Sequence, residues 1–178
     1  DAETRHLKPE AAYSVVRQAA ERALEAGVQC IYKKTDSALR GNVGAELTAV
    51  LDAAGADRLP FIPAFPKTNR VTRDGIHLID GVPVAESVFG QDPFEPVRHS
   101  GVADILGEQS SVPVVLRKPG EAAGDEPGIQ VFDAATDEDL LTIGRQLGAA
   151  GVRLSAGCAG FAEVVADLLA LEGTASRI

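Results

Sequence analysis

The alternation of short apolar runs with amphipathic stretches constrains the fold of this chain more than any other feature of its sequence. Runs rich in β-branched residues predict five short strands, at about 28–32, 59–64, 114–116, 129–132 and 152–155. Patterns of helical period and helix-ending residues predict helices at about 9–26, 43–54, 101–108, 136–149 and 161–171. Strands that alternate with helices predict an α/β fold, in which a mostly parallel sheet carries helices on both faces.

Two Asp-Gly steps interrupt this alternation. Asp74-Gly75 and Asp80-Gly81 enclose the apolar stretch 76–79. Because Asp-Gly between apolar stretches favours tight hairpin turns, we expect a β-hairpin insertion over about 74–85.

Length and charge exclude several classes of protein. A chain of 178 residues fits a single domain. A net charge of −9 argues against a nucleic-acid partner, because binding to a phosphate backbone needs a basic face. No apolar run approaches the roughly 20 residues that cross a bilayer. Cys30 and Cys158 lie in predicted core segments and suggest no disulfide framework, which favours a cytoplasmic protein.

Basic side chains gather in two short segments, 33–40 and 67–73. These segments hold six of the 17 basic residues and one acid, Asp36. Each segment follows a predicted strand, and ligands of parallel sheets bind beyond the carboxyl ends of the strands. We therefore expect a cleft for a small anion. The side chains expected to line it, with the turn at Gly157 nearby, are Lys34, Asp36, Arg40 and Arg70.

The loop 34–42 offers the groups that a hydroxylated carboxylic acid needs. Arg40 provides a planar fork for a carboxylate. Asp36 provides an acceptor for sugar hydroxyls, or a base for the hydroxyl that is phosphorylated. The alternative is an ordinary polar loop between strand and helix, in which Asp36 or Ser37 caps the helix.

Two further segments carry weaker signals. Arg70 offers a second cation, and His77 a hydrogen-bond donor, unless His77 serves only in packing. The turn Gly157-Cys158-Ala159-Gly160 either lets the backbone approach a ligand or allows a strand and a helix to pack closely. No His or Cys spacing is typical of a metal site.

The stretch Lys33-Lys-Thr-Asp-Ser-Ala-Leu-Arg-Gly-Asn-Val-Gly-Ala-Glu-Leu47 resembles the loop-helix signature of the four-carbon acid sugar kinase family. Four further segments resemble motifs of that family in the same order: Pro63-Ala-Phe-Pro66, Asp74-Gly-Ile-His77, Asp80-Gly-Val-Pro-Val84 and Phe89-Gly-Gln-Asp-Pro93. The turn at 157–160 is similar to the family's Gly-Ser-Ala-Gly turn.

The resemblance implies phosphorylation of threonate, erythronate or an oxo-tetronate with ATP and Mg. It implies that residues 1–178 form one α/β domain, a fragment of the N-terminal domain that binds the acid sugar. A separate C-terminal domain would bind the nucleotide, on the same gene or in another chain. The site residues so implied are catalytic Asp36 and substrate-binding Lys34, Ser37, Arg40, Gly41, Asn42, Arg70 and His77, with no metal ligand.

The chain departs from the family pattern in three respects. The family's opening strand and its acidic, glycine-containing motif are expected before Asp1, and the nucleotide domain is missing. Ala38, Asn69 and Cys158 stand where Thr, Gly and Ser are expected, which bears on the identity of the acid. We expect the isolated chain to be inactive and to bind no cofactor. The alternative function is a non-catalytic α/β module that binds a small carboxylate as a sensor or partner subunit.

Overall fold

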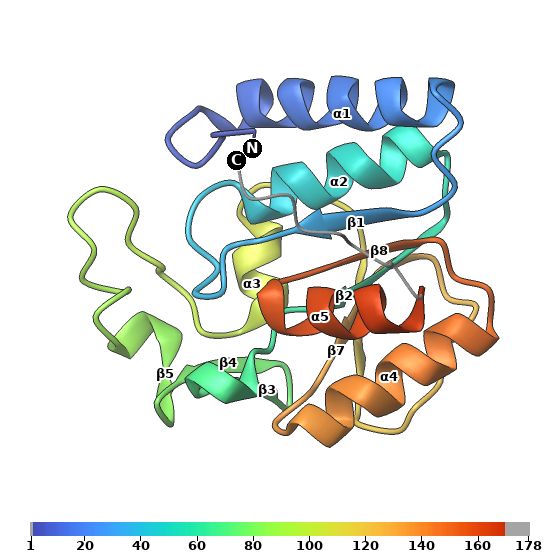
Figure 1. Ribbon diagram of the computed structural model, residues 1–178. Coiled ribbons are helices and arrows are strands. Elements are labelled where there is room, and N and C mark those ends of the chain that lie inside the picture. The colour runs from blue at the N-terminus through green and yellow to red at the C-terminus, as the bar shows by residue number, and fades with distance from the viewer. Residues whose placement is uncertain (1, 170–178) are drawn as a thin grey trace, which may run out of the picture.

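A five-stranded parallel sheet forms the centre of the computed structural model, which describes residues 2–169 (Figure 1). The strand order is β1-β8-β2-β7-β6, and every neighbouring pair is parallel. The strands are β1 Ile31–Lys34, β2 Arg58–Ile62, β6 Val114–Arg117, β7 Gly128–Phe132 and β8 Leu154–Gly157. The predicted α/β fold with a mostly parallel sheet is therefore confirmed.

Helices cover both faces of this sheet, as predicted (Figure 1). One layer consists of α1 Pro9–Glu25, α2 Val43–Ala54 and α3 Val102–Gly107, and the opposite layer of α4 Asp137–Ala149 and α5 Ala159–Leu168. The predicted end of the last helix, at residue 171, lies outside the described residues. Within residues 2–169, no helix is long and apolar enough to cross a membrane.

Two apolar layers form the core, one on each face of the sheet. Phe61 packs in the cluster that includes residues of α2 and α3, whereas its neighbour Ile62 packs with residues of α4 and α5. Val131 and Phe132 divide between the same two clusters. Successive strand residues point to opposite faces, so an uninterrupted apolar run is what a strand buried on both sides requires.

The insertion is a three-stranded antiparallel sheet, which is one strand more than the predicted hairpin. It consists of β3 Arg70–Arg73, β4 Ile76–Ile79 and β5 Val82–Pro83. Both residues of each Asp-Gly step have positive φ, so each step closes a tight turn. Each turn needs a strand on both sides, so a strand also precedes the first turn. The inserted sheet therefore begins at residue 70 rather than at 74.

Two strands of the main sheet begin later than predicted. The first was expected over 28–32, but β1 begins at Ile31, which pairs with Leu154 of β8. Val28 is 42% exposed, so the start of that apolar run is not buried in the sheet. Lys33 and Lys34 consequently belong to β1, and Gly157 belongs to β8 opposite Lys34.

Candidate functional site

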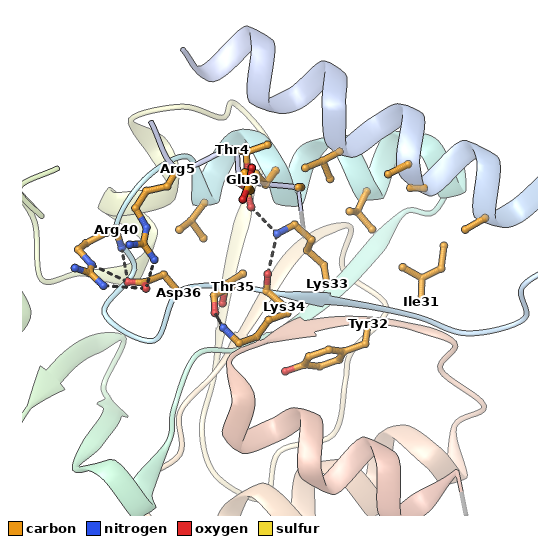
Figure 2. A pocket seen from close by; sticks show the side chains of 18 of the residues that line it. Glu3, Thr4, Arg5, Ile31, Tyr32, Lys33, Lys34, Thr35, Asp36 and Arg40 are labelled. Carbon is orange, nitrogen blue, oxygen red and sulfur yellow. Dashed lines mark hydrogen bonds and ion pairs between the residues drawn. The ribbon is translucent and has the colours of Figure 1, made fainter. Parts of the chain in front are cut away.

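A cavity of about 1090 Å³ lies along the edge strand β1 and the loop after it, between the segment that precedes α1 and the helices α1 and α2 (Figure 2). Its apolar lining includes Val16, Ala19, Ala20, Ala23 and Val50. Its polar lining includes Thr4, Arg5, Lys33, Lys34, Thr35, Asp36, Arg40 and Glu46. The cavity therefore has a charged part and an apolar part, and three of the four side chains predicted to share a cleft, Lys34, Asp36 and Arg40, line it.

Asp36 is the centre of the polar end of the cavity (Figure 2). Nε and Nη2 of Arg40 donate to its two carboxylate oxygens, each at 3.1 Å, and Nη2 of Arg5 donates to Oδ1 at 2.9 Å. The backbone N–H groups of Ala38 and Arg40 donate to Oδ2 at 3.2 and 3.3 Å. Oδ2 thus receives three of these bonds and Oδ1 two, so the protein itself holds the carboxylate in place.

The charge of Asp36 follows from these contacts. Burial by itself would raise the pKa of Asp36, but the hydrogen bonds and charge of Arg40, together with the charge of Arg5, hold it below its ordinary value. The hydrogen bond to Asp36 raises the pKa of Arg40 in turn. Asp36 and Arg40 are therefore an ionised pair at neutral pH.

Arg40 was predicted to hold the carboxylate of a ligand. In the structure its guanidinium is bonded to the carboxylate of Asp36. Its third nitrogen, Nη1, donates to Asp92 at 3.4 Å, and its guanidinium carbon lies 4.9 Å from the ring centre of Phe89. Asp92 and Phe89 belong to a segment quoted above for its family resemblance, but nothing in the sequence pointed to their contact with Arg40.

Arg70 approaches the same aromatic ring from the inserted sheet. Its guanidinium carbon lies 5.8 Å from the centre of Phe89, and its Nη1 donates to the carbonyl of Thr68 at 3.2 Å. The structure thus brings Arg70 to the ring on which Arg40 stacks, but Arg70 is not among the residues that line the cavity.

His77 is fully buried beneath the loop that carries Asp36. Its Nε2 lies 2.9 Å from the carbonyl oxygen of Ser37, and its Nδ1 lies 3.1 Å from the hydroxyl of Thr72. Burial lowers the pKa of His77 to about 4, so the ring is neutral. Since a carbonyl only accepts, Nε2 carries the proton and Nδ1 accepts from Thr72. Both ring nitrogens are engaged within the protein.

The segment before α1 is fastened to the loop and to α2, which sequence reasoning missed. The side-chain amide of Asn42 donates to the carbonyls of Thr4 and Leu7, each at 2.8 Å. The hydroxyl of Thr4 donates to Glu46, which also accepts from the ammonium of Lys33. No local signal in the sequence indicates contacts between positions about 40 residues apart.

The turn at Gly157 serves close packing. A Cβ atom there would lie 2.3 Å from the carbonyl oxygen of Ile62 and 2.6 Å from the hydroxyl oxygen of Tyr32. That hydroxyl donates to the carbonyl of Cys158 at 2.6 Å. Lys34 pairs with Gly157, so this turn does lie beside the predicted loop. In residues 2–169, no group of three or more His, Cys, Asp or Glu side chains could hold a metal ion.

Comparison with known proteins identifies the family. The family described as "Sugar-binding N-terminal domain" matches residues 1–165. This chain belongs to it. The resemblance to four-carbon acid sugar kinases is thereby confirmed, and the chain corresponds to the sugar-binding N-terminal domain of such kinases.

Three curated relatives illustrate the range of substrates in the family. A D-threonate kinase from Bordetella bronchiseptica is 37% identical over 160 residues, which cover 84% of this chain and 39% of that protein. A D-erythronate kinase from Heliobacterium modesticaldum is 38% identical, over 79% of this chain and 36% of its own length. A 3-oxo-tetronate kinase from Methylobacterium radiotolerans is 31% identical, over 80% and 36%. The chain thus matches under two fifths of each.

Solved structures agree with this assignment. One from Bordetella bronchiseptica, a domain-swapped dimer with bound citrate, is 34% identical and superposes with a TM-score of 0.83 over 94% of this chain and 43% of that one. A protein from Haemophilus influenzae superposes with a TM-score of 0.85 over 98% of this chain and 47% of its own, at 20% identity, which supports the fold.

Proposed function

We propose that this chain is the substrate-binding part of an ATP-dependent kinase that phosphorylates a four-carbon sugar acid: threonate, erythronate or 3-oxo-tetronate. The observation that supports this most is the position of ionised Asp36, between two guanidinium groups in the cavity along β1 and the loop after it. A ligand that carries both a carboxylate and hydroxyl groups matches this combination of cations and an acceptor. The activities of the curated relatives point to the same ligands.

Within this proposal, the predicted site residues divide into two kinds. Lys34 and Asp36 line the cavity and are proposed to face the acid, Lys34 as a cation and Asp36 as acceptor or base for a hydroxyl. The others shape the loop. Ser37 is held by His77, Asn42 fastens the segment before α1, Gly41 leaves room for Arg5, and Arg40 and Arg70 stack on Phe89.

The nucleotide requires residues outside this sequence. The chain contains no glycine-rich loop of the G-x-x-x-x-G-K type. Phosphoryl transfer asks the protein mainly for positioning and charge stabilisation. The contribution of this α/β domain would be to hold the sugar acid and to keep Asp36 ionised beside a hydroxyl, while ATP with Mg would bind to a separate nucleotide domain.

Calorimetric titration of the chain with D-threonate and D-erythronate tests the proposal. We expect at least one acid to bind with a dissociation constant of about 1 mM or lower, in the range of ordinary Michaelis constants. Asp36→Asn should weaken binding at least about tenfold, because an amide places a donor where the carboxylate accepts. Asp80→Asn, in an exposed turn that Asn tolerates, should bind as the wild type does. A folded chain that binds neither acid nor 3-oxo-tetronate would contradict the proposal.

A further inference from the structure

We infer that Arg5, rather than Arg40, binds the carboxylate of the sugar acid, and that the acid takes the place of Asp36 on Arg5. This inference rests on the proposed function. It assigns the carboxylate to a residue outside the loop 34–42, in the segment that precedes α1.

Three nitrogens of Arg40 are already bonded to carboxylates of the protein. Its Nε and Nη2 are bonded to Asp36, and its Nη1 to Asp92. One face of the guanidinium stacks on Phe89, and the side chain is only 22% exposed. A ligand carboxylate at the edge formed by Nε and Nη2 would have to displace the bidentate pair on which the shape of the loop depends, since Asp36 also holds the backbone of residues 38 and 40.

Arg5 is in the opposite situation. It lines the cavity, its side chain is 43% exposed, and only its Nη2 donates to a described residue, which is Asp36 at 2.9 Å. A planar two-bond contact to a carboxylate would use Nη2 together with Nε or Nη1, and in the proposed exchange it replaces the single bond to Asp36. Figure 2 shows Arg5 reaching down to Asp36 from above, while Arg40 approaches the same carboxylate from the left.

The backbone of Arg5 is fixed, although its guanidinium is free to pivot. Asn42 binds the carbonyls of Thr4 and Leu7 on either side of it. Gly41 lies so close that a Cβ atom would stand 2.9 Å from Cγ of Arg5 and 3.2 Å from its Cα. The loop therefore fixes the position of the Arg5 backbone. The guanidinium at the end of the side chain can then bind either Asp36 or the carboxylate of the acid.

The exchange satisfies both partners at once. Arg5 supplies one of five bonds to Asp36, and the guanidinium of Arg40 keeps that carboxylate paired when Arg5 leaves. Oδ1 of Asp36 accepts from both Arg5 and Arg40, and the departure of Arg5 frees one acceptor position. A hydroxyl of the bound acid then donates to Asp36 while its carboxylate accepts from Arg5. A neutral polyol of the same length would gain only the first of these bonds.

The test compares D-threonate with D-threitol, the polyol that lacks the carboxylate, by titration of wild-type and variant chains. Arg5→Gln should weaken D-threonate binding about ten- to a hundredfold, the loss expected for a charge-assisted bond, and leave D-threitol binding and the melting temperature unchanged. Arg5→Lys should retain only part of the affinity, because an ammonium cannot form the planar fork. Arg145→Gln, on the exposed face of α4, is the matched control and should bind both ligands as the wild type does.

Arg40→Gln provides the contrast. If Arg40 positions the loop, this variant should lower the melting temperature and weaken both ligands by similar factors. Unchanged D-threonate affinity in Arg5→Gln would overturn the inference, as would an equal loss for D-threonate and D-threitol. Both results would leave the proposed function standing, whereas a wild-type chain that binds no acid would contradict the proposed function itself.

Discussion

The buried imidazole of His77 ties the inserted sheet to the loop that carries Asp36. It donates to the carbonyl of Ser37 and accepts from Thr72 on the neighbouring strand. A protonated ring would have to donate from Nδ1 to the hydroxyl oxygen of Thr72, and the proton of that hydroxyl would then lose Nδ1 as its acceptor. The fold therefore favours the neutral ring, and its stability depends on pH.

The sign of this dependence follows from the two pKa values. The ordinary pKa of histidine is 6.5, and burial lowers that of His77 to about 4 in the folded protein. Between these values the unfolded chain binds the proton more readily, so the free energy of unfolding falls as pH falls from 6.5 to 4, by roughly 3 kcal/mol. Denaturant unfolding of His77→Gln should give a pH profile flatter by about this amount. Parallel profiles for wild type and His77→Gln would refute the assignment.

At the scale of residues, sequence reasoning identified side chains whose neighbours are local. Asp36 and Arg40 are four positions apart, and both were expected at the site. Arg5 was missed because it meets Asp36 across 31 positions, through a segment with no motif of its own. The orientation of the Arg40 fork was also beyond prediction, since it depends on Phe89 and Asp92 from a distant loop.

The loop between β1 and α2 depends on a backbone conformation at Gly41 that few residues adopt. Gly41 has φ +81°, and a side chain there would collide with Arg5. Gly81 has the same φ, but nothing lies within 4 Å of the position that its Cβ would occupy. Substitutions at these two glycines therefore distinguish the loss of stability caused by a positive φ from the loss caused by the collision with Arg5.

Gly41→Ala and Gly81→Ala form a matched pair. Both should lose about 1–2 kcal/mol of unfolding free energy from the unfavourable φ. Gly41→Ala should lose about 1–3 kcal/mol more, because the segment before α1 must move, and its affinity for the acid should fall with the displacement of Arg5. Denaturant unfolding and calorimetry measure the two effects. Equal losses of stability and unchanged affinity in the pair would show that the contact between Gly41 and Arg5 does not matter.

At the scale of elements, the sequence predicted helices better than strand limits. The helix expected over 43–54 is α2 at the same residues, because its apolar pattern and Gly55 with φ +56° mark its course and end locally. The limits of β1 and β8 differ from those expected because pairing between the two strands sets them. The insertion has a third strand because the sequence contains two Asp-Gly turns, whereas the predicted hairpin needs only one turn.

The molecule as a whole combines a five-stranded parallel sheet with a small antiparallel insertion, and a cavity lies along β1 and the loop after it. The chain spans well under half of its curated relatives. The chain should therefore bind a four-carbon acid without transferring phosphate to it from ATP. Incubation with ATP, Mg and D-threonate, followed by mass spectrometry, should reveal no phosphorylated acid. A phosphorylated product made by the purified chain would show that the catalytic machinery is complete in it. The alternative function, a sensor or partner subunit, also predicts that the chain binds the acid without phosphorylating it. The two functions differ for a longer protein that contains this domain, which would transfer phosphate only if it is a kinase.

The central claim is that the acid binds at Asp36, and amide chemical shifts test it most directly. In a ¹⁵N–¹H spectrum recorded during titration with D-threonate or D-erythronate, the largest shifts should come from residues 4–7 and 34–42, around the cavity along β1 and the loop after it. Amides of α4, on the opposite face of the sheet, should remain unchanged. Shifts centred elsewhere on the fold, or no shifts at millimolar concentrations of both acids, would contradict the account.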